Sequence, residues 1–350
     1  MRAIDFNRSP AWRSAMPLAL FSLAASAALV IAIAFAVSIG EIEVPVPDVL
    51  RAIANRIFDA GYAVKPLHEG VIWDYRLSRA LVAACCGAAL SVSGVILQAL
   101  LRNALADPYV LGISAGASTG AVLIVIAGFG GGMISLPVGA FVGAVIAFAI
   151  VALLAAGAGG GTERIILAGV AISQLFNALT SYIVTSSANA EQARGIMFWL
   201  LGNLGGVRWQ DVYLAAGIAI VGCIICQLYA RALDAFSFGA DAAASLGVPV
   251  KQVRLLLFAV TAAMTAVMVS QVGSIGFVGL VIPHAARFVV GPHHRRLLPA
   301  AALMGAVFMV LADIVSRIII PQQVLPIGVV TALVGAPAFA LILYRARRAA

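Results

Sequence analysis

Three arginines near the ends of apolar segments are the side chains best placed to recognise another molecule. Arg76 and Arg79 are three residues apart and share one face of a helix, and Arg317 lies near the end of a later apolar segment. Together they would form an outward basic patch for acidic groups on a soluble partner, because several charges can steer docking where one exposed ion pair is weak. The alternative is that they are interfacial arginines whose guanidinium groups reach water from a helix end.

The ionisable residues give little support for catalysis. Neither of the two lysines, Lys65 and Lys251, belongs to a Gly-Lys-Ser/Thr phosphate loop. Asp313 is the one acid inside an expected membrane span, and Arg317, one helical turn later, can pair with it. We therefore expect no catalytic residue in this chain and expect another subunit to supply any energy that it uses.

Metal and redox chemistry are also not expected. The pair His293-His294 has no acidic or cysteine partner nearby, and we interpret it as a solvated loop. Cys85-Cys86 and Cys223-x-x-Cys226 lie within apolar runs and are interpreted as small packing residues. We expect no cofactor and no metal site in the chain.

The composition requires a membrane around most of the 350 residues. Hydrophobic residues make up 63% of the chain and charged residues 10%, with a mean hydropathy of +1.08. A helical crossing needs ~20 apolar residues, and the alternation of a β-barrel is absent. The sequence predicts one all-α integral membrane domain over 1–350, with an outer loop over 40–75 and a first span too long for a signal peptide. The ten expected spans are 16–39, 80–101, 109–127, 136–156, 165–185, 212–229, 253–272, 276–287, 298–320 and 327–344.

The distribution of charge supports ten spans with both termini in the cytoplasm. In that topology the inner segments carry 14 of the 22 lysines and arginines and 5 of the 14 acidic residues, so their net charge is +9 against −1 outside. This bias follows the positive-inside rule. The basic character of the chain is thus a consequence of topology, and we expect no nucleic acid partner.

A polar insert over residues 231–251 predicts a compact cytoplasmic projection. Two short helices are expected, separated at Gly239 and ended by Gly247 and Pro249. An alanine-rich face of this size suits insertion into a groove of a partner subunit. An ordinary capped loop is the alternative.

Two further apolar segments carry unusual residues. The fifth expected span has a polar stripe, which either joins helices through hydrogen bonds or lines an aqueous path, and we favour the path. Its members are Ser173, Gln174, Asn177, Thr180 and Ser181. The stretch 276–287 contains Gly276 and Gly279, which allow close packing, and Pro283, which frees a carbonyl one turn earlier and bends the helix. We expect a hinge there, with His284 structural or directed toward an ATPase.

Five segments resemble the FecCD-type permeases, the membrane subunits of type II ABC importers for iron–siderophore complexes, haem and vitamin B12. The resemblance covers about residues 70–345 in the order and spacing of the family. It departs from the family at Ser78 and Ala104, where proline is usual. The matching segments are 76–79, 102–117, 198–202, 276–287 and 325–337.

The resemblance implies an assembly and a role for particular residues. Such permeases work as a pair, here expected to be two copies of this chain, with two ATP-binding cassette ATPases that use ATP and Mg²⁺ and one periplasmic binding protein. Arg76, Arg79 and Arg317 match positions that meet carboxylates of the binding protein. Asp241, Leu246 and Gly247 fall in the coupling-helix segment that contacts the ATPase, and the fifth span lines the translocation path.

The expected function is therefore import across the bacterial inner membrane by a permease that is not itself an enzyme. The expected cargo is a large iron complex, with haem favoured over a siderophore. Vitamin B12 is the alternative within the family. An ion-coupled secondary transporter that depends on Asp313 and a membrane scaffold without transport activity are the alternatives outside it.

Overall fold

The fold was obtained as a computed structural model that describes residues 18–40, 44–126, 128, 134–156, 162–187, 189–320 and 323–349. Both chain ends and the glycine run 157–161 lie outside these ranges. The described residues are helical apart from connecting loops and one isolated bridge between Ile320 and Gln323.

The helices follow one another with short connections. In chain order they are α1 (Leu18–Ser38), α2 (Val46–Phe58), α3 (Pro66–Gly70), the π-helical segment η2 (Val71–Leu77), α4 (Ser78–Leu100), the 3₁₀ turn η3 (Pro108–Leu111), α5 (Ile113–Val125), α6 (Leu136–Ala156), α7 (Thr162–Ser187), α8 (Ala190–Leu200), α9 (Trp209–Leu228), α10 (Ala230–Phe236), α11 (Ala240–Ser245), α12 (Val250–Val272), α13 (Val278–Val290), α14 (His294–Ile318) and α15 (Ile327–Ala349).

Every expected span coincides with an apolar helix. Among the described residues, seven helices are long and apolar enough to cross a membrane, and α5, α13 and the apolar part of α15 are shorter. The all-helical membrane fold is confirmed, whereas the count of ten crossings and the cytoplasmic position of both termini stay predictions.

Three boundaries differ from the expected ones for local reasons. The expected outer loop 40–75 is partly helical, since α3, η2 and α4 form one continuous helix from Pro66 to Leu100. The third expected span is divided because Gly112 adopts a φ of +75° between η3 and α5. The stretch 276–287 becomes helical only at Val278, because Phe277 has a φ of +70° and cannot belong to the helix.

Helix α4 is the centre of the core, and nearly all of its residues are buried. It packs against α9, α12, α13 and α14. The crossing with α14 is close, since a Cβ on Gly87 would collide with the carbonyl oxygen of Gly305. Small residues thus let the two backbones approach closely. Such close packing matters in a membrane, because the hydrophobic effect does not drive helices together in lipid.

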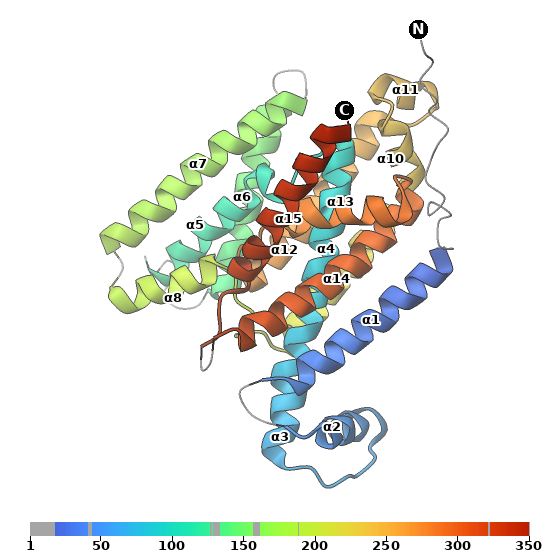
Figure 1. Cartoon of the computed structure of the whole chain (residues 1–350). Helices are drawn as coiled ribbons and strands as arrows, with labels where there is room; N and C mark the ends of the chain where they lie inside the picture. The colour runs from blue at the N-terminus through green and yellow to red at the C-terminus, as the bar shows by residue number, and fades with distance from the viewer. Residues whose placement is uncertain are drawn as a thin grey trace.

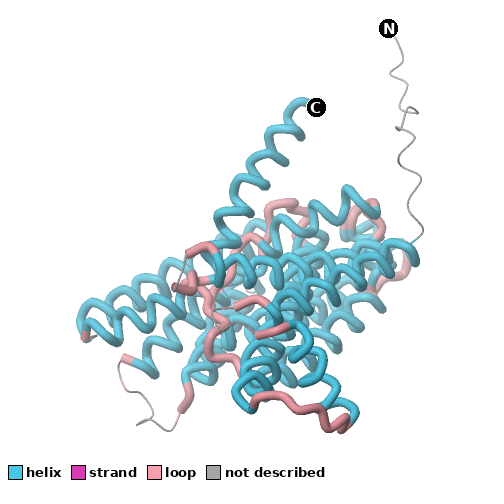
Figure 2. Tube along the Cα trace, turned by 60° about the horizontal axis from the view of Figure 1, so that its bottom comes forward, coloured by secondary structure: helices cyan, strands magenta, loops and turns pink. Residues whose placement is uncertain are grey.

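The ends of the bundle are covered by different short helices. Figure 1 shows α2 and α3 at one end and α10 and α11 at the other, with the end of α15 on the α10–α11 side. It also shows α1 at one edge of the bundle and α7 at the opposite edge. In Figure 2 the last turns of α15 project beyond the neighbouring helices.

Candidate functional site

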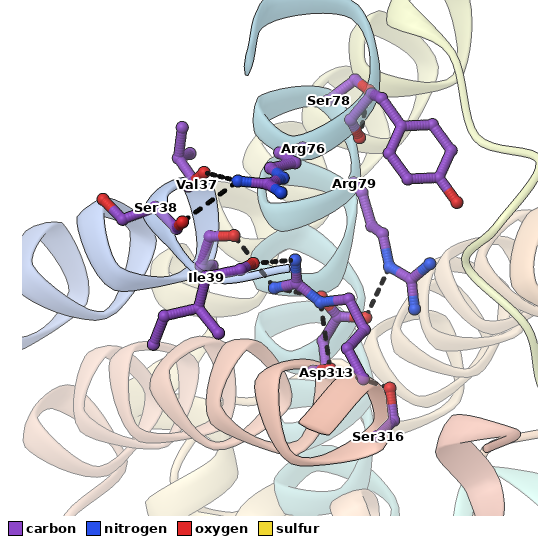
Figure 3. Close-up of polar contacts among 11 residues, drawn as sticks. Val37, Ser38, Ile39, Arg76, Ser78, Arg79, Asp313 and Ser316 are labelled. Carbon is purple, nitrogen blue, oxygen red and sulfur yellow. Dashed lines mark hydrogen bonds and ion pairs between the residues drawn. The ribbon is translucent and has the colours of Figure 1, made fainter. Parts of the chain in front are cut away.

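Two of the three predicted docking arginines share one buried carboxylate. Arg79 Nε donates to Asp313 Oδ1 at 2.7 Å, and Arg317 Nη2 lies 3.2 Å from Asp313 Oδ2 (Figure 3). Asp313 is fully buried, and Arg79 and Arg317 are 2% and 9% exposed. The predicted pairing of Asp313 with Arg317 is confirmed, and Arg79 is an additional partner from α4.

The carbonyl groups at the end of α1 engage two of these arginines. Arg76 Nη1 donates to the carbonyl oxygens of Val37 and Ser38, both at 3.0 Å. Arg317 donates to those of Ala36 at 3.0 Å and Ile39 at 2.8 Å. The last carbonyl groups of a helix have no hydrogen-bond partners within that helix. Here guanidinium groups cap the end of α1, one from α14 and one from η2, the segment that leads into α4.

The arginines consequently do not form the exposed basic patch that their spacing suggested. They are buried because the carboxylate of Asp313 and the negative end of the α1 dipole offset part of their charge. They do line a cavity of about 540 Å³ at the end of the bundle that carries α3. Its other lining residues are Gly40, Pro66, Leu67, Gly70, Val71, Tyr75 and Val324. A role in meeting a binding protein stays a prediction.

Several of the segments that carried the family resemblance meet at one junction in the bundle. The N–H of Asn203 donates to the carbonyl of Val272 at 2.8 Å, and the N–H of Ile327 donates to that of Gly202 at 2.9 Å. Non-helical backbone at membrane depth must find such partners inside the protein. The ends of α8 and α12 and the start of α15 are thus joined through their backbones.

Tyr109 joins a further segment to this junction. Its hydroxyl donates to the carbonyl of Ile275 and accepts from the N–H of the same residue, both at 2.8 Å. Asp107 accepts from the N–H of Tyr109 at 2.9 Å, and Ser114 donates to Ser274 at 2.9 Å.

In the loop before η3, desolvation raises the pKa of the Asp107 carboxyl to about 6.

The predicted hinge in α13 is held by partners that the sequence did not reveal. The N–H that Pro283 lacks would have bonded to the carbonyl of Gly279, four residues earlier. Gln98 Nε2 of α4 donates to that carbonyl at 3.3 Å, and Arg287 Nη1 donates to Gln98 Oε1 at 2.6 Å. The carbonyl freed by the proline is therefore satisfied by α4.

The two glycines of the predicted hinge lie in different surroundings. Gly279 packs closely, since its carbonyl faces Gly94 and an added Cβ would lie 2.7 Å from Pro108 Cδ. Gly276 has open space around its Cα, and the chain changes direction at Phe277, where Gly335 of α15 leaves room for the ring. The hinge role of Gly276, Gly279 and Pro283 stays a prediction, and the structure favours the break at 276–277 as the place where α13 turns.

The polar stripe of α7 divides between two faces. Thr180 is buried, and its hydroxyl lies 2.8 Å from that of Thr119 on α5, so it joins helices. Gln174, Asn177 and Ser181 are exposed, and Ser173 is partly exposed. Amide side chains on the surface of a membrane helix need water or a polar partner. That these residues line a translocation path stays a prediction.

The segment 231–251 forms the two short helices expected, α10 and α11. They separate at Gly239, with φ of +109°, and α11 ends before Gly247, with φ of +80°. Asp241, Leu246 and Gly247 are exposed, as an ATPase contact requires. Their role in that contact stays a prediction.

A contact between the partly exposed Asp234 and the buried His294 fixes this segment to the membrane helices. Asp234 Oδ1 accepts from the N–H of His294 at 2.9 Å and lies 2.7 Å from His294 Nδ1. His294 opens α14, so the carboxylate of α10 caps α14 from another helix. The contact was missed because the two residues are 60 apart in sequence.

The described part of the chain is a multi-pass helical membrane bundle with a pair of short helices, α10 and α11, at one end. The model of the FecCD transport family matches residues 28–345, and the chain belongs to this family. It is a permease of the ABC importer class, located in the bacterial inner membrane.

Named relatives cover most of the chain. The cobalamin import system permease protein BtuC of Halobacterium salinarum is 38% identical over 81% of this chain and 75% of that protein. The vitamin B12 import system permease protein BtuC of Escherichia coli O9:H4 is 40% identical over 81% and 86%. The uncharacterised ABC transporter permease protein YvrB of Bacillus subtilis is 38% identical over 91% and 92%.

Solved structures agree with the fold. An inward-facing conformation of a putative metal-chelate type ABC transporter matches with a TM-score of 0.81 at 30% identity, over 93% of this chain and 99% of that one. PsaBC from Streptococcus pneumoniae matches with a TM-score of 0.55 at 21% identity, over 76% and 90%, and shows the fold alone. Permeases of this family act with separate ATPase subunits and a substrate-binding protein.

Proposed function

We propose that this chain is the permease of an importer that carries a large metal chelate, cobalamin, into the cytoplasm. The observation that carries the proposal is 38–40% identity, over four-fifths of the chain, to permeases named for cobalamin or vitamin B12 import. The match to a metal-chelate type transporter supports the broader class of cargo.

This proposal replaces the earlier preference for haem. The named relatives do not support an iron complex, and the YvrB relative, which matches the longest part of the chain among the three, has no stated cargo. Cobalamin and haem are both large tetrapyrrole-type chelates, so one wide path would suit either. In this proposal the binding protein selects the cargo.

The working unit is proposed to be a homodimer of this chain with two ATPases and one binding protein. The exposed amides Gln174 and Asn177 on α7 support a second copy or a water-filled path beside that face. The exposed Leu246 and Asp241 suit an ATPase contact, and the arginine-lined cavity at the opposite end suits acidic groups of a binding protein.

Uptake of radiolabelled cobalamin into proteoliposomes that hold the whole complex tests the cargo. We expect uptake that unlabelled cobalamin competes away and that haem or a ferric siderophore leaves unchanged. Uptake of haem in preference to cobalamin would contradict the proposal.

A further inference from the structure

Helix α2 has an apolar face that the rest of the chain leaves uncovered. Val49 and Ala52 are buried against Val37 of α1 and Ile72 of η2. Val46, Leu50, Ile57 and Phe58 are each more than half exposed. In a helix Val46, Leu50 and Ile57 share one side, because spacings of four and seven residues return to the same face.

Polar residues on the other faces of α2 contact α3. Arg56 Nε lies 3.0 Å from Glu69 Oε1 of α3, and His68 Nδ1 lies 2.8 Å from Asp48 Oδ2. These contacts fix how α2 is rotated about its axis. The uncovered apolar face therefore belongs to a helix held in one orientation.

The height of α2 in the membrane follows from its neighbours. Ile72, on which α2 packs, precedes Trp73, whose ring stacks on Trp209 with centroids 4.8 Å apart. Trp209 Nε1 donates to the carbonyl of Trp73 at 3.1 Å, and Trp209 is the first residue of the spanning helix α9. Tryptophans at the ends of spans mark the boundary between lipid tails and water, so α2 lies at this boundary.

The direction of α2 agrees with that position. Figure 1 shows α2 nearly end-on below α1, whereas α4 is seen lengthwise, running from the bottom toward the top of the picture. The helix thus crosses the end of the bundle at its α1 edge, away from α7. The exposed Ile31 and Phe35 of α1 continue the apolar surface up to the end of that helix.

We propose that α2 is an interfacial membrane helix that inserts Val46, Leu50 and Ile57 between the lipids of the adjacent leaflet. Its amphipathic character, its low overall hydropathy and the exposed apolar residues of the neighbouring α1 fit such a helix. It anchors the end of α1, and with it the carbonyls that Arg76 and Arg317 cap. The proposal does not depend on the cargo or on the transport activity.

Fluorescence of the purified chain in nanodiscs tests this position. The single variants Leu50→Cys and Ile57→Cys are labelled with an NBD maleimide. Arg51→Cys, at a half-exposed polar position of the same helix, is the matched control. The unsubstituted chain, treated with the same maleimide, shows how much label the native cysteines take up. Nitroxide groups on the lipid tails report contact with lipid, and iodide reports contact with water.

We expect the labels at positions 50 and 57 to emit at shorter wavelength than the label at 51, to lose intensity with nitroxide lipids and to resist iodide. Equal quenching by iodide at all three positions would overturn the proposal. A label at position 50 that leaves water only when a partner protein or a second copy is added would also overturn it, since α2 would then be a protein docking surface. Because all three positions are exposed, the substitutions leave the core unchanged.

Discussion

Asp313 lies between two guanidinium groups near the end of α14, where it is fully buried. Removing one partner of a buried ion pair lowers the free energy of unfolding, because the remaining charge is then desolvated without a counter-charge. The same carboxylate positions Arg317 on the carbonyls of α1, so the strength of this cluster decides how firmly α1 is held.

Replacing Asp313 with asparagine should therefore destabilise the protein. We expect a loss of about 3–5 kcal/mol, because Arg79 and Arg317 remain buried without a counter-charge. Thermal unfolding in nanodiscs measures it, with the exposed Asp74→Asn at the same end as control. Unchanged stability together with lost transport would instead favour an ion-coupled transporter in which Asp313 carries the ion.

The Asp107 carboxyl gives a pH dependence with a definite sign. Its pKa is raised to about 6 from an ordinary value of 3.8, so the folded protein favours the protonated form. The stabilisation is present below pH 3.8 and is lost as the pH rises through about 6. Asp107→Asn should reduce the fall in melting temperature between pH 5 and pH 7, and an identical fall in both proteins would contradict this.

At the scale of the elements, α14 connects the two ends of the molecule. Its first residue bonds to Asp234 of α10, and its last turns carry Asp313 and Arg317. A movement of α10 and α11 by an ATPase is therefore expected to reach α14 directly.

Asp234→Ala removes a capping carboxylate and should cost about 0.5–2 kcal/mol. In the assembled complex we expect basal ATP hydrolysis to persist while stimulation by the binding protein and transport both fall. Asp234→Asn keeps an oxygen for the N–H of His294 and should restore part of both. Equal stimulation in Asp234→Ala and the parent complex would exclude this route.

The helices that match the expected spans were predictable because each is an apolar run, and α10 and α11 because glycines mark their ends. The contacts between helices were not. Periodicity assigns a face to Arg79, Gln98 or Asp234 but does not identify what lies opposite, and their partners are 234, 189 and 60 residues away. The arginines were therefore predicted as exposed, whereas the structure buries them.

At the scale of the whole molecule, one copy leaves Gln174, Asn177 and Ser181 of α7 exposed on the edge opposite α1. A second copy beside that edge would enclose a path whose lining includes Gln174 and Asn177. Cross-linking of Asn177→Cys in native membranes should yield a dimer, whereas Leu23→Cys on the outer face of α1 should not. Cross-linking at both positions, or at position 23 alone, would contradict this dimer.

This chain is expected to transport cargo with energy from a partner ATPase. Uptake into proteoliposomes that contain the permease, with and without its ATPase, tests this claim most directly. We predict cobalamin uptake only when the ATPase is present, ATP and Mg²⁺ are inside and loaded binding protein is outside. Uptake by the permease alone under a proton or sodium gradient would contradict it.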